Sequence, residues 1–325
     1  MTSNVKSFVL GVSYGLIMRL LFGGLGIFTF AGKGTANGVM LAAFVILVPI
    51  VVGVLTIYNL DHAELSLASA IYKPWIPTLA FVAGTALLML EGSICIAMAL
   101  PIFLFAASVG GLLAYIAARS FRLTPGAMSA IMALPLVLGY FETMVPLPQN
   151  TFVAKDSVFI ATKPDEVWNL INYAVQIQPE EMRGGLAYKI GVPYPMEAIT
   201  QTADGRRIRR LKWQKDVSFD EPITAWEENR FIKWSYAFKP ESFPPGSLDE
   251  HILIGGKYFD LIDTSYRLTP EGAGTRLEIV VNYRVSTNFN FYATSWAQIL
   301  VDDAAATILG FYKHRSERQQ IGNRT

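Results

Sequence analysis

The chain has 325 residues, a formal net charge of +1 and one cysteine, Cys95. Such a balanced charge argues against a nucleic-acid-binding protein, and a single cysteine excludes a disulfide within the chain. The histidines His62, His251 and His314 are far apart and lack ligand spacing. We therefore expect no histidine- or cysteine-based metal site, and no cofactor.

Charge divides the chain into two halves. Residues 1–150 carry 6 Lys/Arg and 4 Asp/Glu, whereas residues 151–325 carry 21 and 22. A chain of this length is long enough for two domains. We expect a multi-pass transmembrane domain over residues 1–148, a water-facing domain over residues 149–318 and a tail over residues 319–325.

Several apolar segments in the first half are long enough to cross a membrane. A spanning helix needs about 20 mostly apolar residues. The qualifying segments are residues 8–30, 38–58, 76–121, which fits two spans, and the shorter 127–141. The prediction is five spans, with four as the alternative. The first segment is too long for a cleavable signal peptide and contains Arg19.

The basic residues of the short loops predict the orientation, because Lys and Arg are enriched in cytoplasmic loops. Arg119 and Arg122 lie between the last two predicted spans, and Lys6 and Lys73 fall on the same side, so we expect this side to be cytoplasmic. Only Lys33 falls on the other side. Five spans then place the water-facing domain outside the cytoplasm, in the periplasm of a bacterial cell. The orientation reverses if the last segment lies along the membrane surface.

Two charged residues in the apolar half each have two interpretations. Arg19 lies within the first span, where an arginine faces a partner or a water-filled cavity, or extends along the helix to the interface. Glu91 lies at the break between the third and fourth spans, where it is either a functional carboxylate or a residue of an interfacial turn. Gly110, Ala114 and Ala118, spaced by four residues, predict a close contact between helices.

The second half opens with a strand over residues 152–160, and Thr162 with Pro164 then predicts the start of a short helix. Asp204-Gly205 predicts a hairpin turn. The further predicted strands cover residues 196–203, 206–213, 224–228, 230–238 and 275–286, and residues 251–268 hold one long strand or two short ones. A long helix over residues 289–318 closes the domain, and its predicted buried face contains Trp296, Leu300, Ala304, Ile308 and Phe311.

This order predicts an α+β domain, a curved antiparallel sheet wrapped on the C-terminal helix, after a membrane helical bundle. The sequences VFIATKPDEVWNLI (158–171), RFIKWSYAF (230–238) and TRLEIVVNYRVS (275–286), with the closing helix, resemble the START-like or SRPBCC superfamily. This is the helix-grip fold of polyketide cyclases, dehydrases and lipid-transfer domains. The resemblance covers residues 152–318. The resemblance implies a ligand cavity between the sheet and the helix, because members of the superfamily share this cavity far more than they share a reaction.

Aromatic side chains dominate the expected cavity lining. Strand alternation places Trp234, Tyr236 and Phe238 on one face. The expected ligand-binding residues are Trp213, Trp234, Tyr236, Phe238, His251, Tyr258, Tyr266, Trp296 and Leu300. For any single aromatic residue of this set, a place in the hydrophobic core is the alternative.

A few polar residues are candidates for chemistry. His251 follows the proline-rich segment 240–250 and precedes an apolar run; in an enzyme it would act as acid or base together with Asp260 and Tyr258. Asp263 and Arg284 are expected on the solvent face. The basic segment RRIRRLK (206–212) predicts a solvated hairpin, with contact to anionic lipid head groups as the alternative.

The sequence favours a membrane-anchored START-like protein that binds or transfers a lipid or another apolar small molecule at the membrane surface. Residues 172–195 and 240–250 would act as lids. Two alternatives remain at this point. One is a cyclase/dehydrase-type enzyme acting on a hydrophobic substrate, and the other is a non-catalytic membrane sensor or scaffold.

Overall fold

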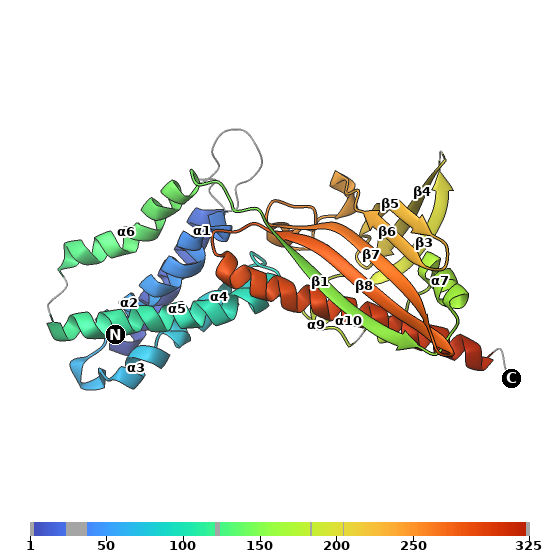
Figure 1. Ribbon diagram of the computed structural model, residues 1–325. Helices are drawn as coiled ribbons and strands as arrows, with labels where there is room; N and C mark the ends of the chain where they lie inside the picture. Colours follow the sequence, from blue (N-terminus) through green and yellow to red (C-terminus); the bar gives the residue numbers. More distant parts are fainter. Residues whose placement is uncertain (1–2, 24–37, 121–123, 183, 204, 323–325) are drawn as a thin grey trace. The chain divides into compact units, whose positions relative to one another are not determined.

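The computed structural model describes all residues except 1–2, 24–37, 121–123, 183, 204 and 323–325 (Figure 1). The chain divides into two compact units. The first, here called the helical unit, contains Met1–Leu147 and Thr287–Phe289. The second, here called the sheet unit, contains Pro148–Ser286 and Asn290–Thr325.

The described part of the helical unit is built from helices and turns. Its longer helices are α1 (Ser3–Gly23), α2 (Val48–Tyr58), α4 (Trp75–Leu87), α5 (Ser93–Ser120) and α6 (Pro125–Glu142). A π-helix, Ala43–Leu47, leads directly into α2, and the short helix α3 (Leu67–Tyr72) precedes α4. Single turns of 3-10 helix occur at Gly38–Met40 and His62–Glu64.

Three of the described helices, α1, α5 and α6, are long and apolar enough to cross a membrane, and Ala43–Tyr58 is a shorter apolar helix. The predicted break inside residues 76–121 is present, because α4 ends at Leu87 and α5 begins at Ser93. The end of the first predicted span and Lys33 lie outside the described residues, as does Arg122. The number of spans therefore stays a prediction.

Glycine allows α2 and α5 to approach each other closely. A Cβ atom on Gly53 would lie 2.0 Å from the carbonyl oxygen of Ala107, and one on Gly110 would lie 1.9 Å from that of Ile50. The predicted small-residue contact is thus present at Gly110, and Ala114 is buried too. Ala118 is exposed, because the contact ends before the last turn of α5.

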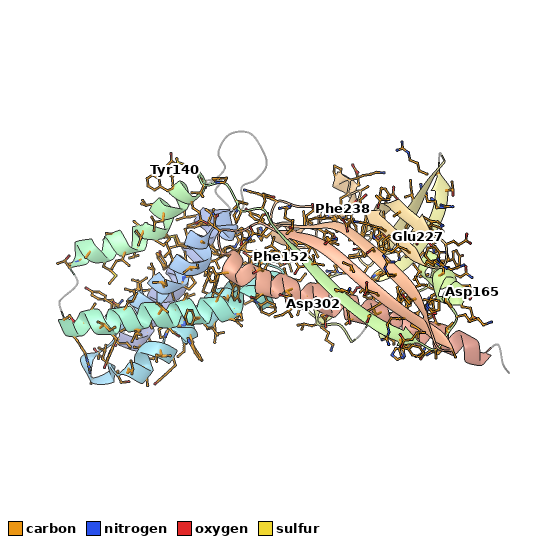
Figure 2. The ribbon with its side chains drawn as sticks, viewed as in Figure 1. Tyr140, Phe152, Asp165, Glu227, Phe238 and Asp302 are labelled. Carbon is orange, nitrogen blue, oxygen red and sulfur yellow. The ribbon has the colours of Figure 1, made fainter. Side chains whose placement is uncertain are left out.

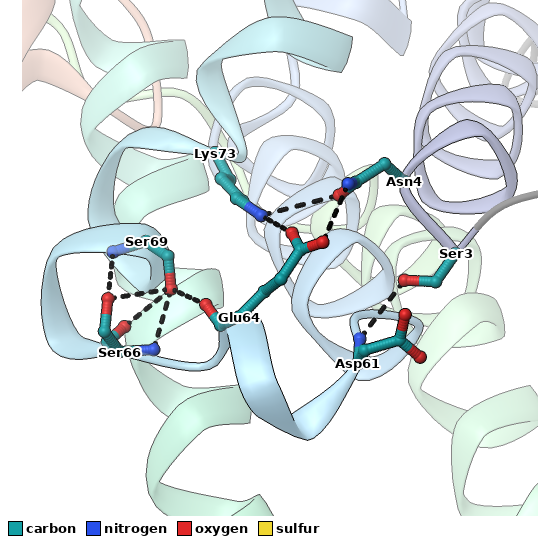
Figure 3. A network of polar contacts seen from close by, with 7 residues as sticks. All are labelled: Ser3, Asn4, Asp61, Glu64, Ser66, Ser69 and Lys73. Carbon is teal, nitrogen blue, oxygen red and sulfur yellow. Dashed lines mark hydrogen bonds and ion pairs between the residues drawn. The ribbon is translucent and has the colours of Figure 1, made fainter.

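A polar network joins the start of α1 to the connection between α2 and α4 (Figure 3). The Glu64 carboxylate accepts hydrogen bonds from Asn4 Nδ2, at 3.0 Å, and from the ammonium group of Lys73. The backbone N–H of Asp61 donates to Ser3 Oγ at 3.1 Å. The Lys73 ammonium group lowers the pKa of Glu64, which keeps this carboxyl ionised. These contacts hold the two segments at the same end of the helical unit.

The sheet unit contains an eight-stranded antiparallel sheet in the order β1-β8-β7-β6-β5-β4-β3-β2. The strands are β1 (Asn150–Ile160), β2 (Tyr173–Ala174), β3 (Pro195–Ala203), β4 (Arg206–Trp213), β5 (Ser218–Glu227), β6 (Phe231–Ser235), β7 (Phe259–Glu271) and β8 (Gly274–Val285). Ala203 pairs with Arg206, so the predicted hairpin between β3 and β4 is confirmed, although Asp204 itself lies outside the described residues.

The sheet curves around the long helix α10 (Asn290–Gly322) (Figure 1). Two side chains of α10 hold its far end to β1: Lys313 Nζ donates to the carbonyl oxygen of Phe159 at 2.8 Å, and Glu317 accepts from the backbone N–H of Ala161 at 3.1 Å. The shorter helices of the unit are α7 (Pro164–Asn172), α8 (Pro179–Met182) and α9 (Leu186–Lys189). The predicted arrangement of sheet and C-terminal helix is therefore confirmed.

The buried row of α10 lies directly beside the predicted row, displaced by one position along the sequence. Its buried row contains Ala293, Ala297, Val301, Ala305, Leu309 and Tyr312. Of the predicted row only Phe311 is buried, whereas Trp296, Leu300, Ala304 and Ile308 are half-buried. Both rows are apolar, and the sheet packs against the one with more alanines, which allows a closer approach.

Three local predictions were wrong. The strand expected from residue 251 begins only at Phe259, because Glu250–Ile252 forms a 3-10 turn. The strand expected from residue 224 begins at Ser218 and includes Pro222. Thr162 does not cap α7: Lys163 is the cap residue, and the Thr162 hydroxyl is buried without a hydrogen-bond partner among the described residues.

Candidate functional site

A buried ion pair lies inside the sheet unit. Arg209 on β4 and Glu221 on β5 are directly opposite each other in the strand register. Nη1 of Arg209 lies 2.6 Å from Oε2 of Glu221, and the two residues are only 4% and 2% exposed. Strand alternation places Arg209 on the same face as the buried Leu211, and Glu221 on the same face as the buried Phe219. The pair thus points into the interior.

Aromatic side chains from β6, β7 and α10 surround this pair. The guanidinium carbon of Arg209 lies 4.9 Å from the ring centre of Trp234, and Arg209 Nη2 donates to the Tyr312 hydroxyl at 3.1 Å. Tyr266 lies edge-on to both aromatic rings, with ring centres 5.0 Å from Trp234 and 5.7 Å from Tyr312. We call Arg209, Glu221, Trp234, Tyr266 and Tyr312 the Arg209 cluster.

Two N–H donors in the Arg209 cluster have no hydrogen bond of standard geometry among the described residues, although the Trp234 indole lies close enough to the Glu221 carboxyl to act to lower its pKa. They are Nε of Arg209 and the indole N–H of Trp234, and both atoms are fully buried. Buried polar groups in proteins are nearly always hydrogen-bonded, and an unsatisfied one costs roughly 1–3 kcal/mol. The cluster therefore offers donors that an acceptor atom could satisfy.

Burial determines the electrostatics of the Arg209 cluster. It raises the pKa of the Glu221 carboxyl from 4.5 to about 7, although the charge of Arg209 acts to lower it. Burial acts to lower the pKa of Arg209, but the Glu221 carboxylate together with Tyr312 and Tyr266 acts to raise it, and the pKa lies above its ordinary value. Burial also raises the pKa of Tyr266. Arg209 therefore stays charged, whereas Glu221 exchanges its proton near neutral pH.

A second aromatic layer extends from the cluster towards the end of β6. The hydroxyls of Tyr236 and Thr264 lie 2.6 Å apart, and the Tyr236 ring lies 6.2 Å from that of Phe219. Phe219 also contacts Phe238, at 5.2 Å between ring centres, and Trp213, at 5.2 Å. Phe238 follows β6 (Figure 2). Tyr236, Phe238 and Trp213 keep some accessible surface, unlike Trp234 beneath them.

The structure brings together only part of the predicted site residues. Trp234 and Tyr266 belong to the Arg209 cluster, and Trp213, Tyr236 and Phe238 belong to the second aromatic layer. Tyr258 is buried just before β7. His251 lies in the 3-10 turn before it. Trp296 and Leu300 are half-buried on α10, in the row beside the one that meets the sheet.

The predicted acidic candidates lie on the opposite face of the sheet. Asp260 and Asp263 pair across the strands with Arg284 and Asn282, which alternate with the buried Tyr283. Asp263 accepts a hydrogen bond from Asn282 at 2.6 Å. Asp260 lies 4.0 Å from Arg284, and burial raises its pKa while Arg284 acts to lower it. Neither carboxylate shares a face with Thr264 or Tyr266.

The sequence-based prediction missed Arg209, Glu221 and Tyr312. Interpreting residues 206–212 as a solvated hairpin was wrong for Arg209, although Arg206, Arg207 and Arg210 are exposed. A usable signal existed, since Arg209 alternates with Leu211 along the apolar face of its strand. Glu221 lay in the part of β5 that was not predicted, and Tyr312 lay outside the predicted face of α10.

Comparison with known proteins gives structural matches only. No protein-family model matches the chain, and neither does any curated protein. Among solved structures, Zhui aromatase/cyclase from a Streptomyces species is 14% identical, with a TM-score of 0.32, over 52% of this chain and 96% of that one. A Thermus thermophilus protein is 16% identical with a TM-score of 0.34, over 52% and 99%. Truncated norcoclaurine synthase from Thalictrum flavum is 14% identical with a TM-score of 0.28, over 50% and 95%. Such values carry no information on ligand or reaction.

Proposed function

We propose that the sheet unit binds an apolar small molecule that carries one polar group, in a protein anchored in a membrane by its helical unit. The observation that carries this proposal is the Arg209 cluster. It combines a buried ion pair and two unsatisfied donors with aromatic rings in the interior of the domain. A ligand with a single acceptor group, such as a lipid, has the complementary chemistry: its apolar body contacts the rings and its oxygen accepts from the buried N–H groups.

The cost of burying charge supports a role other than stability for Arg209 and Glu221. Removing an ion from water costs of the order of several kcal/mol even after relaxation, and the attraction within the pair often only offsets this cost. Apolar residues of similar volume serve stability equally well or better. An ion pair at this position is better explained by recognition of a polar group.

Contacts within the helical unit support a topology in which successive helices cross the membrane in opposite directions. Gly11 and Gly15 of α1 lie against Pro77 and Phe81 of α4, so these two helices run in the same direction. The ring of Phe44, at the start of the Ala43–Tyr58 helix, lies 6.1 Å from that of Phe103, and Gly53 further along lies against Ala107 of α5. These two helices therefore also run in the same direction, as the second and fourth of alternating passes must.

The remaining contacts complete the alternation. The Glu142 carboxylate, at the end of α6, accepts from the backbone N–H groups of Ala42 and Ala43, at 2.6 and 2.9 Å. The end of α6 and the start of the Ala43–Tyr58 helix are therefore at one end of the unit. The network around Glu64 (Figure 3) holds the starts of α1 and α4 at the other. This pattern favours five passes and puts Lys73 on the side of the N-terminus, which the positive-inside rule makes cytoplasmic.

The proposal is tested by replacing the buried pair with apolar residues in the full chain. Arg209→Met/Glu221→Leu should leave the protein folded, because apolar side chains of similar size are tolerated at buried ion pairs. It should also abolish co-purification of the ligand, detected by mass spectrometry of extracted small molecules. The control is Arg210→Met, since Arg210 is exposed on the same strand. A folded double variant that retains the wild-type ligand would refute the proposed role of the pair.

One observation favours a second function, an enzyme acting on a hydrophobic substrate. The pKa of Glu221 lies at about 7, and a general acid or base works best when its pKa is close to the working pH. His251, Asp260 and Tyr258 remain candidates from the sequence. Incubation of the purified protein with its co-purified ligand would reveal a mass change if catalysis occurs. The Glu221→Gln variant should then lose turnover by about two to four orders of magnitude. An unchanged ligand mass supports the binding function.

A further inference from the structure

Lys215 connects two segments that are far apart in the sequence. Its Nζ atom donates to the carbonyl oxygen of Gly191 at 3.2 Å and to that of Ser247 at 3.1 Å. Gly191 belongs to residues 186–192, which begin with α9, and Ser247 belongs to residues 240–248, the larger part of the proline-rich segment 240–250 after β6. We call these two the α9 segment and the prolyl segment. One side chain therefore bridges both.

The turn that carries Lys215 has an unusual backbone conformation. Lys215 and its neighbour Asp216 both have φ of +58°, in the left-handed region. The backbone N–H of Val217 donates to the carbonyl oxygen of Gln214 at 3.3 Å, which closes a turn between β4 and β5. Two consecutive positive φ values are typical of hairpin turns that contain Asn-Gly or Gly-Gly, and they disfavour a residue such as lysine. The two hydrogen bonds of the Lys215 side chain thus offset the conformational cost of placing a lysine where the backbone favours glycine.

The prolyl segment lies on the second aromatic layer. The ring of Phe243 is 5.5 Å from that of Phe238 and 6.3 Å from that of Phe219. Phe219 contacts Tyr236, whose hydroxyl reaches Thr264 beside the Arg209 cluster. A continuous series of ring contacts therefore runs from the prolyl segment to the interior of the domain.

The α9 segment lies on the other side of Lys215 and is attached to α10. The backbone N–H of Ala187 donates to Asp303 Oδ2 at 3.0 Å. The ring of Tyr188 lies 6.4 Å from that of Tyr194, and the carbonyl oxygen of Tyr194 accepts from the backbone N–H of Gln214. Lys215 thus joins a segment fixed to the helix with a segment fixed to the aromatic face of the sheet.

We propose that Lys215 is a latch that holds the α9 segment and the prolyl segment together and so limits the rate at which a ligand enters and leaves the domain. The inference rests on the proposed ligand-binding function and adds a control of access to it. Both hydrogen bonds of Lys215 end on backbone carbonyl groups, so their loss changes no side chain that contacts the Arg209 cluster. Opening should therefore affect exchange rates more than affinity. If the latch stabilises the closed form equally with and without ligand, its removal speeds association and dissociation by the same factor.

The first test measures opening without any ligand. Hydrogen–deuterium exchange of the full chain should be about five-fold faster in both segments of Lys215→Met, because two hydrogen bonds from an exposed charged donor contribute modestly. Lys215→Gly should give the same result, since glycine favours this turn and keeps the domain folded. Lys215→Arg should restore protection. The control is Lys212→Met, which removes an exposed lysine that lies 3.0 Å from Glu197 on the neighbouring strand. Unchanged exchange in either segment of both Lys215→Met and Lys215→Gly would overturn the latch.

The second test measures ligand exchange with a defined probe, cis-parinaric acid, a fluorescent apolar carboxylate. The full chain in phosphatidylcholine nanodiscs is loaded with the probe and mixed with excess vesicles in a stopped-flow instrument. Release and uptake should both be about five-fold faster in Lys215→Met, with an unchanged Kd. Faster hydrogen exchange with unchanged probe rates would overturn the control of access. If the wild-type protein takes up no probe, the ligand proposal fails for this chemical class, while the exchange experiment still decides whether the latch exists.

Discussion

Arg19 and Glu91, 72 residues apart in the sequence, form an ion pair inside the helical unit, with 2.6 Å between Nε and Oε1. Arg19 Nη2 also donates to the carbonyl oxygen of Leu90 at 2.6 Å. Both side chains are largely buried. The sequence left two interpretations open for each residue. The ion pair explains why an arginine and a glutamate both lie in this apolar half of the chain. Arg19 neutralises the carboxylate and satisfies a backbone carbonyl in the connection between α4 and α5, where an apolar environment would leave both groups uncompensated.

Removing one member of this pair should destabilise the protein more than removing both. Arg19→Met leaves an uncompensated carboxylate and should lower the free energy of unfolding by about 3 kcal/mol. Arg19→Met/Glu91→Leu should recover much of this loss. Thermal unfolding of the detergent-solubilised full chain measures the effect in a double-mutant cycle. Additive effects of the two substitutions would show that the pair does not contribute as a unit.

Glu221 should make stability depend on pH in an uncommon direction. Its pKa is about 7 in the folded protein and 4.5 without the protein environment, so the folded state binds more protons between these values. The contribution of this carboxyl is therefore fully present below pH 4.5 and is lost as pH rises through 7, by of the order of 3 kcal/mol. The melting temperature of the wild type, relative to Glu221→Gln, should fall by several degrees between pH 4.5 and 7.5. A constant difference would contradict the raised pKa.

The contact between α2 and α5 should not tolerate an added methyl group. Gly110→Ala would place Cβ against the backbone of Ile50, so the helices must separate, and we expect a loss of roughly 1–3 kcal/mol. The matched control is Gly310→Ala on α10, where a Cβ meets nothing within 4 Å. That substitution should stabilise the helix by roughly 0.5–1 kcal/mol. Thermal unfolding distinguishes the two, and equal effects would contradict the close contact.

The indole N–H of Trp234 should contribute to ligand binding. Trp234→Phe keeps an aromatic ring but removes the unsatisfied donor, so we expect affinity for a ligand with an acceptor group to fall about ten-fold, in line with one hydrogen bond. The comparison is Trp226→Phe, because Trp226 packs against Trp168, with 4.7 Å between ring centres, away from the Arg209 cluster. Equilibrium binding of the co-purified ligand measures both. Equal affinities of the two variants would argue against Trp234 as a ligand contact.

The orientation in the membrane can be tested with reporter fusions. Five passes with Lys73 and Arg119 in the cytoplasm put the C-terminus on the opposite side. A reporter that is active only outside the cytoplasm should therefore work when fused after Thr325 and fail when inserted at the loop that contains Lys73. A C-terminal fusion active only in the cytoplasm would reverse the orientation.

The sequence by itself determined the order and type of most elements. The charge distribution separated an apolar helical region from a balanced domain, and the hairpin of strands β3 and β4 was correctly placed. The succession of strands and a long closing helix was sufficient to predict the helix-grip arrangement. These features depend on local periodicity and turn chemistry, which short stretches of sequence contain.

Only the tertiary structure decided which charges lie inside. Arg209 is one of five basic residues in the eight-residue strand β4, and nothing local distinguishes it from its neighbours until Glu221 is brought opposite. The same holds for Arg19 and Glu91, and for the choice between two adjacent apolar rows on α10. A buried charge needs a partner, and partners distant in sequence are brought together only by the fold. Burial of a charge is therefore a property of the pair, and no single stretch of sequence contains it.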